Sequence, residues 1–404
     1  PTCEVSINSD QLVTANFDKT KPAQTFKLDV TITGKSGKVK GTKGINCPSD
    51  CTGTLSTGTT VQLTASADPG SVFTGWDGGD CAGTGVCIIK MFADKTVMAG
   101  FEEMKKIGTA TLIETDDSGK ANSPRVGVDS QGNAIAIWQQ LDGQESYILA
   151  SQYVKGAVWE STTIISEQNT GNASFPKVAV NANGNIMAIW QQADKKRNDI
   201  WARSFVPGTG WETSVLIETN DTGTALFPQV ALDSEGNAIA IWQQANKKRM
   251  DIWANRFVAG TGWETPVLIE TNNTGSASLP QVGVDSNGNA MAIWQQSNKK
   301  RMDIWANRFI SGIGWETPTL IETRDIGSAL VPQIAVDPKG NAMAVWQQSD
   351  SKKKSIWANR YTVNVGWESP VVIEIDDIER ASAPQITVDS EGNAVVVWRQ
   401  SNRG

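Results

Sequence analysis

The sequence predicts an all-β protein, a six-bladed β-propeller of 52-residue four-stranded repeats preceded by a small disulfide-containing β domain. The first observation is a WQQ or WRQ motif that recurs every 52 residues. The second is the alternation of apolar and polar residues in short runs between turn residues, which is the period of strands. The third is that all five cysteines lie before residue 88. The motif begins at Trp138, Trp190, Trp242, Trp294, Trp346 and Trp398.

The 404 residues divide by pattern into three segments. Residues 105–404 hold the repeats, residues 21–104 form one complete β module, and residues 1–20 are interpreted as the end of an earlier module. This interpretation rests on residues 3–17 and 87–101, which match in Cys, Asp, Val, Ala and Phe at the same spacing. We therefore expect the sequence to be a fragment of a longer chain, in which Cys3 pairs upstream of Pro1.

Four cysteines lie in two close pairs, Cys47 with Cys51 and Cys81 with Cys87. Short spacings in a Gly- and Thr-rich β pattern are typical of disulfides in exported proteins. Zinc is the alternative, but the six-residue spacing of the second pair fits a zinc site poorly. We predict two disulfides and a secreted or cell-surface location, with the periplasm as the other oxidising compartment.

The segments GTTVQLTA, GSVFTGW and DKTVMAGF follow one another between residues 58 and 101. In this order they resemble the internalin B-repeat-like modules of bacterial surface proteins. The resemblance implies a spacer or stalk, and it covers roughly eighty residues. Trp76 is expected in the core of this module rather than at a ligand platform.

Each repeat is expected to contain four strands, which in one copy are PQVGVD, NAMAIWQQ, DIWANRF and TPTLIET. The DSNGN turn between the first two has Gly where a positive φ is needed. Fifteen of the sixteen tryptophans occupy three repeat positions, so they are expected to pack between neighbouring units. A small residue at the centre of each first strand indicates that this strand is innermost. These residues are Gly127, Ala179, Ala231, Gly283, Ala335 and Thr387.

A lone outer strand, TATLIET, precedes the first repeat, and the sixth repeat ends after its second strand. We predict that this strand, residues 109–115, completes the last blade. A six-bladed ring would then lack one strand, unless the natural protein carries more copies.

The composition limits the chemistry. The chain has no histidine, which excludes His-based triads and His metal sites, and we expect no catalysis, no metal and no cofactor. A calcium loop at DSNGN is excluded because its third position is Lys339 in one repeat. The segment VDSNGNAMAIW distantly resembles the Asp-box hairpin of sialidase-like propellers, although it lacks the Ser or Thr before the Asp. A sialidase-like glycoside hydrolase is therefore the least favoured alternative.

One candidate surface is a set of inter-blade grooves at the ends of the second strands. Amide and carboxyl groups there would hold sugar hydroxyls at several places. The alternative is that these groups satisfy loop backbone between blades. The residues are Gln192, Gln244, Gln296, Gln348, Asp221, Asn273 and Asp325.

The second candidate surface is an arc of basic turns between the second and third strands, on a chain of net charge −7. We expect it to gather an anionic polysaccharide. The alternative is a set of solvated turns paired in part with Glu218, Glu270 and Glu322. Its residues are Lys195, Lys196, Arg197, Lys247, Lys248, Arg249, Lys299, Lys300, Arg301, Lys352, Lys353 and Lys354.

Together these patterns predict a non-catalytic extracellular or cell-surface binding protein of bacteria, an adhesin or lectin-like module for glycans or an anionic surface. The alternative is a structural subunit of an extracellular layer or filament, in which the chain associates with itself. Nucleic acid is not expected as a partner, because the basic residues lack interleaved aromatic residues. No membrane span is expected, because no apolar run reaches the length of about eighteen residues that a spanning helix needs.

Overall fold

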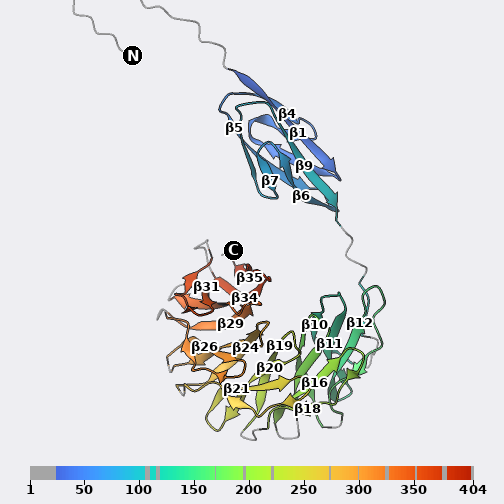
Figure 1. The fold of residues 1–404 in the computed structure, drawn as a ribbon, viewed down its shortest axis with the longest axis vertical. Coiled ribbons are helices and arrows are strands. Elements are labelled where there is room, and N and C mark those ends of the chain that lie inside the picture. Colours follow the sequence, from blue (N-terminus) through green and yellow to red (C-terminus); the bar gives the residue numbers. More distant parts are fainter. Residues whose placement is uncertain are drawn as a thin grey trace, which may run out of the picture. The chain divides into compact units, whose positions relative to one another are not determined.

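The computed structural model describes residues 24–104, 110–114, 119–168, 170–193, 197–219, 223–272, 274–298, 300–323, 327–350, 353–374 and 380–401. The chain divides into two compact units, Pro1–Ala110 and Thr111–Gly404 (Figure 1). Both are built of strands, which confirms the all-β prediction. In the part of the chain that is described, no helix is long and apolar enough to cross a membrane. The predicted module end at residues 1–20 lies outside the described residues.

The first unit is a sandwich of two sheets, with strand orders β4-β1-β9-β6-β7 and β3-β2-β5-β8. Side chains alternate between inward and outward along each strand, and the inward ones form the core. Val61 and Leu63 of β5, for example, are fully buried. The strands are β1 (Thr25–Gly34), β2 (Gly37–Gly41), β3 (Asn46–Cys47), β4 (Thr52–Ser56), β5 (Thr60–Ala67), β6 (Ser71–Gly78), β7 (Cys81–Gly83), β8 (Cys87–Lys90) and β9 (Lys95–Glu103), with a 3-10 turn at Thr42–Gly44.

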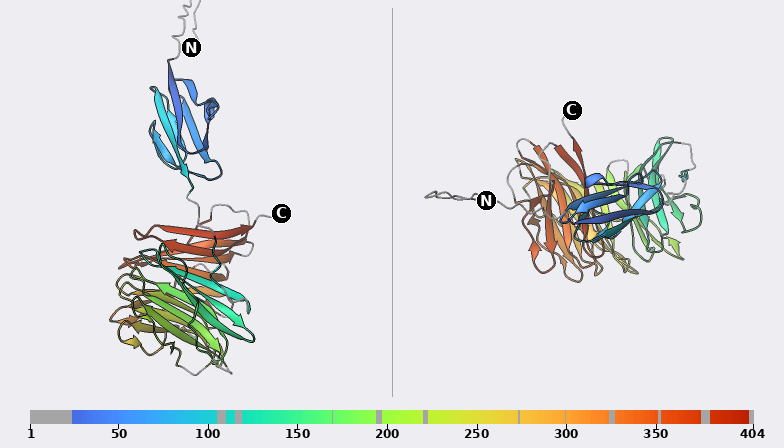
Figure 2. Two further views of the ribbon diagram at one scale, coloured as in Figure 1. Left: turned by 90° about the vertical axis from the view of Figure 1, so that its right-hand side faces the viewer. Right: turned by 90° about the horizontal axis from the view of Figure 1, so that it is seen from above.

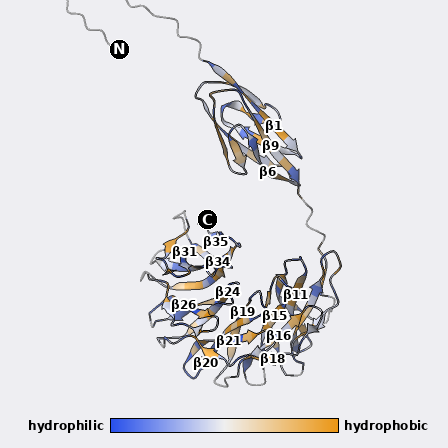
Figure 3. Ribbon diagram, viewed as in Figure 1, coloured by the Kyte–Doolittle hydropathy of each residue, from blue (hydrophilic) through white to orange (hydrophobic). Residues whose placement is uncertain are grey.

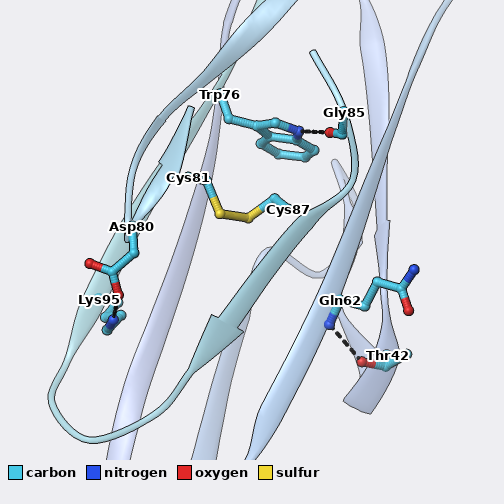
Figure 4. Close-up of a disulfide and its surroundings, with 8 residues drawn as sticks. All are labelled: Thr42, Gln62, Trp76, Asp80, Cys81, Gly85, Cys87 and Lys95. Carbon is cyan, nitrogen blue, oxygen red and sulfur yellow. Dashed lines mark hydrogen bonds and ion pairs between the residues drawn. A yellow bond between two sulfur atoms is a disulfide. The ribbon is translucent and has the colours of Figure 1, made fainter. Parts of the chain in front are cut away.

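Two disulfides join the sheets of this unit, as predicted. Cys81 begins β7 in one sheet and Cys87 begins β8 in the other, and their Cα atoms are 5.4 Å apart (Figure 4). The second bridge links Cys47 of β3 to Cys51, directly before β4, again across the two sheets. Trp76 lies buried beside the first bridge and donates its indole N–H to the Gly85 carbonyl at 2.7 Å, which confirms its place in the core.

The second unit is a series of antiparallel sheets, one for each repeat. Sheets one to five begin with three paired strands, and the third strand also pairs with short outer segments. The first strands are β10 (Ala121–Val128), β14 (Ala173–Val180), β19 (Ala225–Leu232), β24 (Ala277–Val284), β29 (Ala329–Val336) and β34 (Arg380–Val388). The second strands are β11 (Ala134–Asp142), β15 (Ile186–Ala193), β20 (Ala238–Asn246), β25 (Ala290–Ser297), β30 (Ala342–Asp350) and β35 (Ala394–Ser401).

The third and outer strands complete the first five sheets. The third strands are β12 (Glu145–Tyr153), β16 (Asn198–Val206), β21 (Arg249–Val258), β26 (Met302–Ile310) and β31 (Lys353–Thr362). The outer segments are β13 (Thr163–Ile164), β17 (Gly210–Trp211), β18 (Val215–Leu216), β22 (Gly262–Trp263), β23 (Val267–Leu268), β27 (Gly314–Trp315), β28 (Thr319–Leu320), β32 (Gly366–Trp367) and β33 (Val371–Val372). Of the predicted fourth strand, TPTLIET in one copy, only Thr319–Leu320 forms a strand, and the separate segment Gly314–Trp315 before it also pairs with the third strand.

Successive sheets pack face to face along an open arc (Figures 1 and 2). Hydrophobic segments run through the interior strands (Figure 3). The first strands of neighbouring sheets lie against each other: a Cβ on Gly283 would come within 2.6 Å of the Val336 Cγ2 atom. The turns of sheets two to six line one shared pocket of about 370 Å³, with Asn181, Asp233, Asp285, Pro338 and Asp389 among its residues. The repeats are thus arranged around a common axis, as the blades of a propeller are.

The closed six-bladed ring is not confirmed. The sixth sheet contains only β34 and β35 among the described residues, and no sheet closes the array. The prediction that residues 109–115 complete this last sheet is wrong, because the described residues 110–114 form no strand. Ile113 instead packs against Trp138 and Leu149 of the first sheet. Apolar packing on the nearest sheet thus replaces the predicted strand pairing.

Three hydrogen bonds recur between successive sheets and set their relative rotation. The Gln244 amide donates to the Glu218 carboxylate at 2.7 Å, and the Asn255 amide donates to the Ile217 carbonyl at 3.1 Å. The third bond runs from the Phe227 N–H to the Gln191 Oε1 atom at 3.2 Å. The next two interfaces repeat all three bonds. The glutamine–glutamate bond is 2.7 Å long at both, the asparagine–carbonyl bond is 3.0–3.1 Å long, and the bond to the glutamine Oε1 atom is 3.0–3.2 Å long. Because these hydrogen-bond lengths barely change, each sheet is related to the next by nearly the same rotation and translation.

Candidate functional site

The second unit has two ends at which loops can present side chains. We call the end with the turns between second and third strands the tip face; Asn246 and Arg249 flank one such turn. The opposite end, where the turns such as Asp285–Asn289 join first and second strands, is the turn face. At this turn the Asp285 carboxylate accepts bonds from the backbone of Asn287 and Asn289, and Gly288 has a φ of 75°. The prediction of turn chemistry for DSNGN is confirmed, since these local bonds account for the Asp and the Gly.

The glutamines predicted to line grooves on the tip face lie inside the protein. Gln192, Gln244, Gln296 and Gln348 are at most 1% exposed. In each case the Oε1 atom accepts the indole N–H of the tryptophan two residues earlier, at 2.8–3.0 Å. Their amide N–H groups link neighbouring sheets: those of Gln244 and Gln348 donate to glutamate carboxylates, and those of Gln192 and Gln296 also donate to loop carbonyls, which is the backbone contact that the alternative described. The other predicted groove residues, Asp221, Asn273 and Asp325, lie outside the described residues.

The glutamates that follow the outer strands are buried as well. Glu218, Glu270 and Glu322 are at most 2% exposed and accept the amides of Gln244, Gln296 and Gln348 at 2.7 Å. Burial raises the pKa of Glu270 to about 7, the bond from Gln296 opposes this rise, and the nearby negative charge of Asp251 adds to it. The interface between the third and fourth sheets therefore holds a carboxyl group that titrates near neutral pH.

The arginines of the basic tips pair with buried aspartates two residues later in the chain. Arg197, Arg249 and Arg301 pair with Asp199, Asp251 and Asp303 at 2.9, 2.6 and 3.0 Å. The arginine side chains are only 24–26% exposed, and the aspartates are less than 10% exposed. The alternative of partial pairing with Glu218, Glu270 and Glu322 stays a prediction, and the shortest ion pairs of these arginines are those with the neighbouring aspartates.

Among the lysines, Lys247, Lys248 and Lys300 are exposed, whereas Lys353 and Lys354 are half-buried in β31. Lys195, Lys196, Lys299 and Lys352 lie outside the described residues. Capture of an anionic polysaccharide by these lysines stays a prediction.

Changing Lys247 and Lys248 to serine is expected to weaken binding to an acidic polysaccharide column, so that the variant elutes at lower salt. The melting temperature should stay nearly constant, because exposed substitutions change stability by about 0.5 kcal/mol or less. Arg249→Ser should instead lower the free energy of unfolding by about 3 kcal/mol, since the buried Asp251 loses its charged partner and keeps the Asn246 amide. Unchanged elution of the double lysine variant would contradict a binding role of this tip.

Two grooves of similar size lie between neighbouring sheets on the turn face. Groove 1, between the first and second sheets, has a volume of about 220 Å³ and is lined by Asn133, Gln152, Tyr153 and Phe205, among others. Groove 2, between the second and third sheets, has a volume of about 240 Å³. Its lining includes Ser204, Glu212, Glu235 and Phe257. The two grooves use equivalent positions of the repeat, 52 residues apart.

In groove 2, an apolar wall faces a polar rim. Phe257 is half-buried and packs on Trp263, with ring centroids 5.5 Å apart, which holds its orientation. Glu212 and Glu235 are exposed, and the Ser204 hydroxyl donates to the Glu212 carboxylate at 2.6 Å. Such a groove offers both a flat apolar surface and hydrogen-bonding oxygens to a small ligand.

The next two interfaces carry an arginine at the position of Ser204. Arg256 takes the place of Ser204, lies 5.5 Å from the centre of the Phe309 ring and pairs with Glu264 at 3.1 Å. Arg308 lies likewise 5.6 Å from the centre of the Tyr361 ring. The guanidinium group therefore covers the aromatic wall in these two interfaces, whereas Gln152 and Ser204 leave it open.

Sequence reasoning placed the candidate grooves on the tip face and missed those on the turn face. A signal was present in the residue before the third-strand aromatic, which is Gln152, Ser204, Arg256, Arg308 and Arg360 in successive repeats. This change of size and charge is a signal in the sequence that the interfaces differ there.

Comparisons with known proteins bear mainly on the first unit. Residues 28–105 match the family model described as a divergent InlB B-repeat domain, which confirms the predicted resemblance of this module. No curated protein matches the chain.

Among solved structures, a protein of unknown function from Dyadobacter fermentans is 11% identical, with 83% of this chain and 96% of that chain covered and a TM-score of 0.47. The intramolecular trans-sialidase from Ruminococcus gnavus is 10% identical, with coverage of 73% and 93% and a TM-score of 0.45. The fucose-specific lectin from Aleuria aurantia is 14% identical, with coverage of 69% and 87% and a TM-score of 0.41.

Proposed function

We propose that the chain is an extracellular, non-catalytic glycan-binding protein of the bacterial cell surface, in which grooves 1 and 2 bind sugar residues. The observation that carries the proposal is the pairing of an open aromatic wall with carboxyl and amide groups in two equivalent grooves. A sugar ring has a face of C–H groups and a rim of hydroxyls, so it matches such a wall and rim.

The size of the grooves limits the ligand. Their volumes of about 220 and 240 Å³ lie below the ~300–1,000 Å³ of pockets for drug-sized molecules. They suit one sugar residue each, and neighbouring grooves on one rigid array suit repeated residues of a polymer. Two weak sites engaged together bind more tightly than one, because the second contact is intramolecular.

The extracellular location is supported by the surface-protein family of the first unit and by the two disulfides, which persist in oxidising compartments. The absence of histidine from the sequence supports binding over catalysis, because the commonest general acid–base group is missing.

The test begins with a glycan array probed with the purified chain, followed by calorimetry on a glycan that binds. Ser204→Arg should close groove 2 and Gln152→Arg should close groove 1, and the double variant should bind at least tenfold more weakly. Arg256 and Arg308 occupy this position in the same fold, so the new arginines are expected to be tolerated.

Arg256→Ser is the matched control, because it uncovers the Phe309 ring and should add a third site. A blank array for the native chain would refute glycan binding. Full affinity in the double arginine variant would place the site elsewhere.

A further inference from the structure

Every first strand of the second unit contains a β-bulge near its tip-face end. The pairing register of β14 with β15 shifts between Ser174 and Lys177, and Phe175 within this bulge has a φ of 52°. The other five first strands repeat the shift and place a non-glycine residue at a φ of 50–54°. These residues are Ser123, Phe227, Leu279, Val331 and Ala383. Such a φ costs free energy for residues other than glycine, so the bulge is a strained position.

The side chains at these bulges vary although the backbone does not. Ser123 and Ala383 show that the fold forms the bulge with a small side chain. Phe175 and Phe227 instead carry rings whose centroids are 5.4 Å apart, in an edge-to-face arrangement. Phe175 is 44% exposed, so burial in the core does not account for its ring. Strain together with exposure indicates a contact made outside the fold.

The surrounding structure fixes the position of the second ring. The Phe227 N–H donates to the Gln191 Oε1 atom of the preceding sheet at 3.2 Å. The next residue, Pro228, is buried and restricts the backbone beside the ring. The ring is therefore held in place before any ligand arrives, which reduces the conformational entropy that binding costs.

Two basic residues lie on the faces that meet these rings. Lys177 pairs in register with Ile189, whose side chain packs at the interface with the third sheet. Because paired residues share a face of their sheet, Lys177 faces the sheet that carries Phe227. Arg125 holds the same position in β10 and faces the sheet that carries Phe175. Each ring thus has a cation on the sheet before it.

Neither cation is paired with a carboxylate in the part of the chain that the structure describes. Lys177 is half-buried, and burial lowers its pKa to about 8, with the nearby charge of Arg125 adding to this lowering. Arg125 donates to the Pro124 carbonyl at 2.8 Å. The fold does not require a charge at this position, because the other four sheets carry glutamine. These residues are Gln229, Gln281, Gln333 and Gln385. Two neighbouring cations without a counter-ion attract an anionic group.

We propose that a small aromatic carboxylate binds to a cluster on the first strands, which we call the inner cluster and which consists of Arg125, Phe175, Lys177 and Phe227. The ring of the ligand packs on the two phenylalanine rings and continues their edge-to-face arrangement. Its carboxylate accepts hydrogen bonds from the two cations. The polar side chains of the inner cluster only donate hydrogen bonds, whereas grooves 1 and 2 also offer acceptors to sugar hydroxyls. The inner cluster is therefore a separate site, with a different class of ligand.

The experiment is calorimetry of the full chain with hydrocinnamate. The comparison compounds are propionate, which lacks the ring, and hydrocinnamamide, which lacks the charge. Hydrocinnamate should bind one to one, and each comparison compound should bind at least about fivefold more weakly. Lys177→Gln and Phe175→Ser should each weaken hydrocinnamate binding by a similar factor. Both variants are expected to fold, because glutamine and serine occupy these positions in other sheets.

Leu279→Ser is the matched control, because it changes the same bulge position in the fourth sheet, where the preceding sheet carries Gln229 instead of a cation. This variant should bind hydrocinnamate as the native chain does, and circular dichroism checks that every variant is folded. A loss in Leu279→Ser equal to that in Phe175→Ser would overturn the proposal, since it would show general adsorption to apolar surface. The absence of hydrocinnamate binding at millimolar concentration, or full affinity in Lys177→Gln and Phe175→Ser, would overturn it as well. None of these outcomes bears on glycan binding in grooves 1 and 2.

Discussion

Trp294→Ala is expected to lower the free energy of unfolding of the second unit by about 3–5 kcal/mol. The Trp294 side chain is 0% exposed and packs among Ile239, Ile241 and Ile252 of the preceding sheet. Its removal leaves a cavity between two sheets, and it also removes the indole donor from the Gln296 Oε1 atom, 3.0 Å away. Urea unfolding followed by circular dichroism measures the loss.

Trp398→Ala is the matched control for this change. Trp398 stands in the same motif and donates to the Gln400 Oε1 atom at 3.2 Å, but it lies in the two-stranded last sheet and is partly exposed. Removing its side chain should lower the free energy of unfolding by much less, about 1 kcal/mol. Equal losses for the two variants would contradict the conclusion that burial between sheets, rather than the motif itself, stabilises the array.

The second large effect is a change of stability with pH that depends on Glu270. Its pKa in the folded protein is about 7, against an ordinary value of 4.5. Between these values the folded state binds the proton more tightly than the unfolded state does, so stability falls as the pH rises through this range. Below pH 4.5 the group is neutral in both states and its burial carries no charge penalty. Above pH 7 the buried carboxylate is charged and the full penalty applies.

Glu270→Gln should remove this dependence. The difference in unfolding free energy between the variant and the native chain should be small at pH 5 and grow in favour of the variant to about 1–3 kcal/mol at pH 8. Glu316→Gln, at an exposed glutamate, should give a flat difference over the same range. If the difference in unfolding free energy between Glu270→Gln and the native chain did not change with pH, the Glu270 carboxylate would be ionised in the folded protein without a loss of stability. Urea melts at each pH supply both curves.

The sequence by itself determined the features that depend on short-range pattern. The 52-residue period and the alternation within each strand specify which residues form strands and turns. The spacing of Cys81 and Cys87 and the Gly in each DSNGN-type turn were also sufficient, because a disulfide loop and a tight turn involve only neighbouring residues.

Only the tertiary structure decided which polar groups are available for function. The Gln296 amide meets Glu270, which lies 26 residues away, and the Leu279 N–H meets Gln243, which lies 36 residues away. Such contacts depend on the rotation between sheets, which no pattern within one repeat specifies. The same rotation places grooves 1 and 2 on the turn face and leaves the two ends of the array apart. Alternation within a strand assigns a side chain to one face of its sheet, whereas the neighbouring sheet decides whether that face is buried or open.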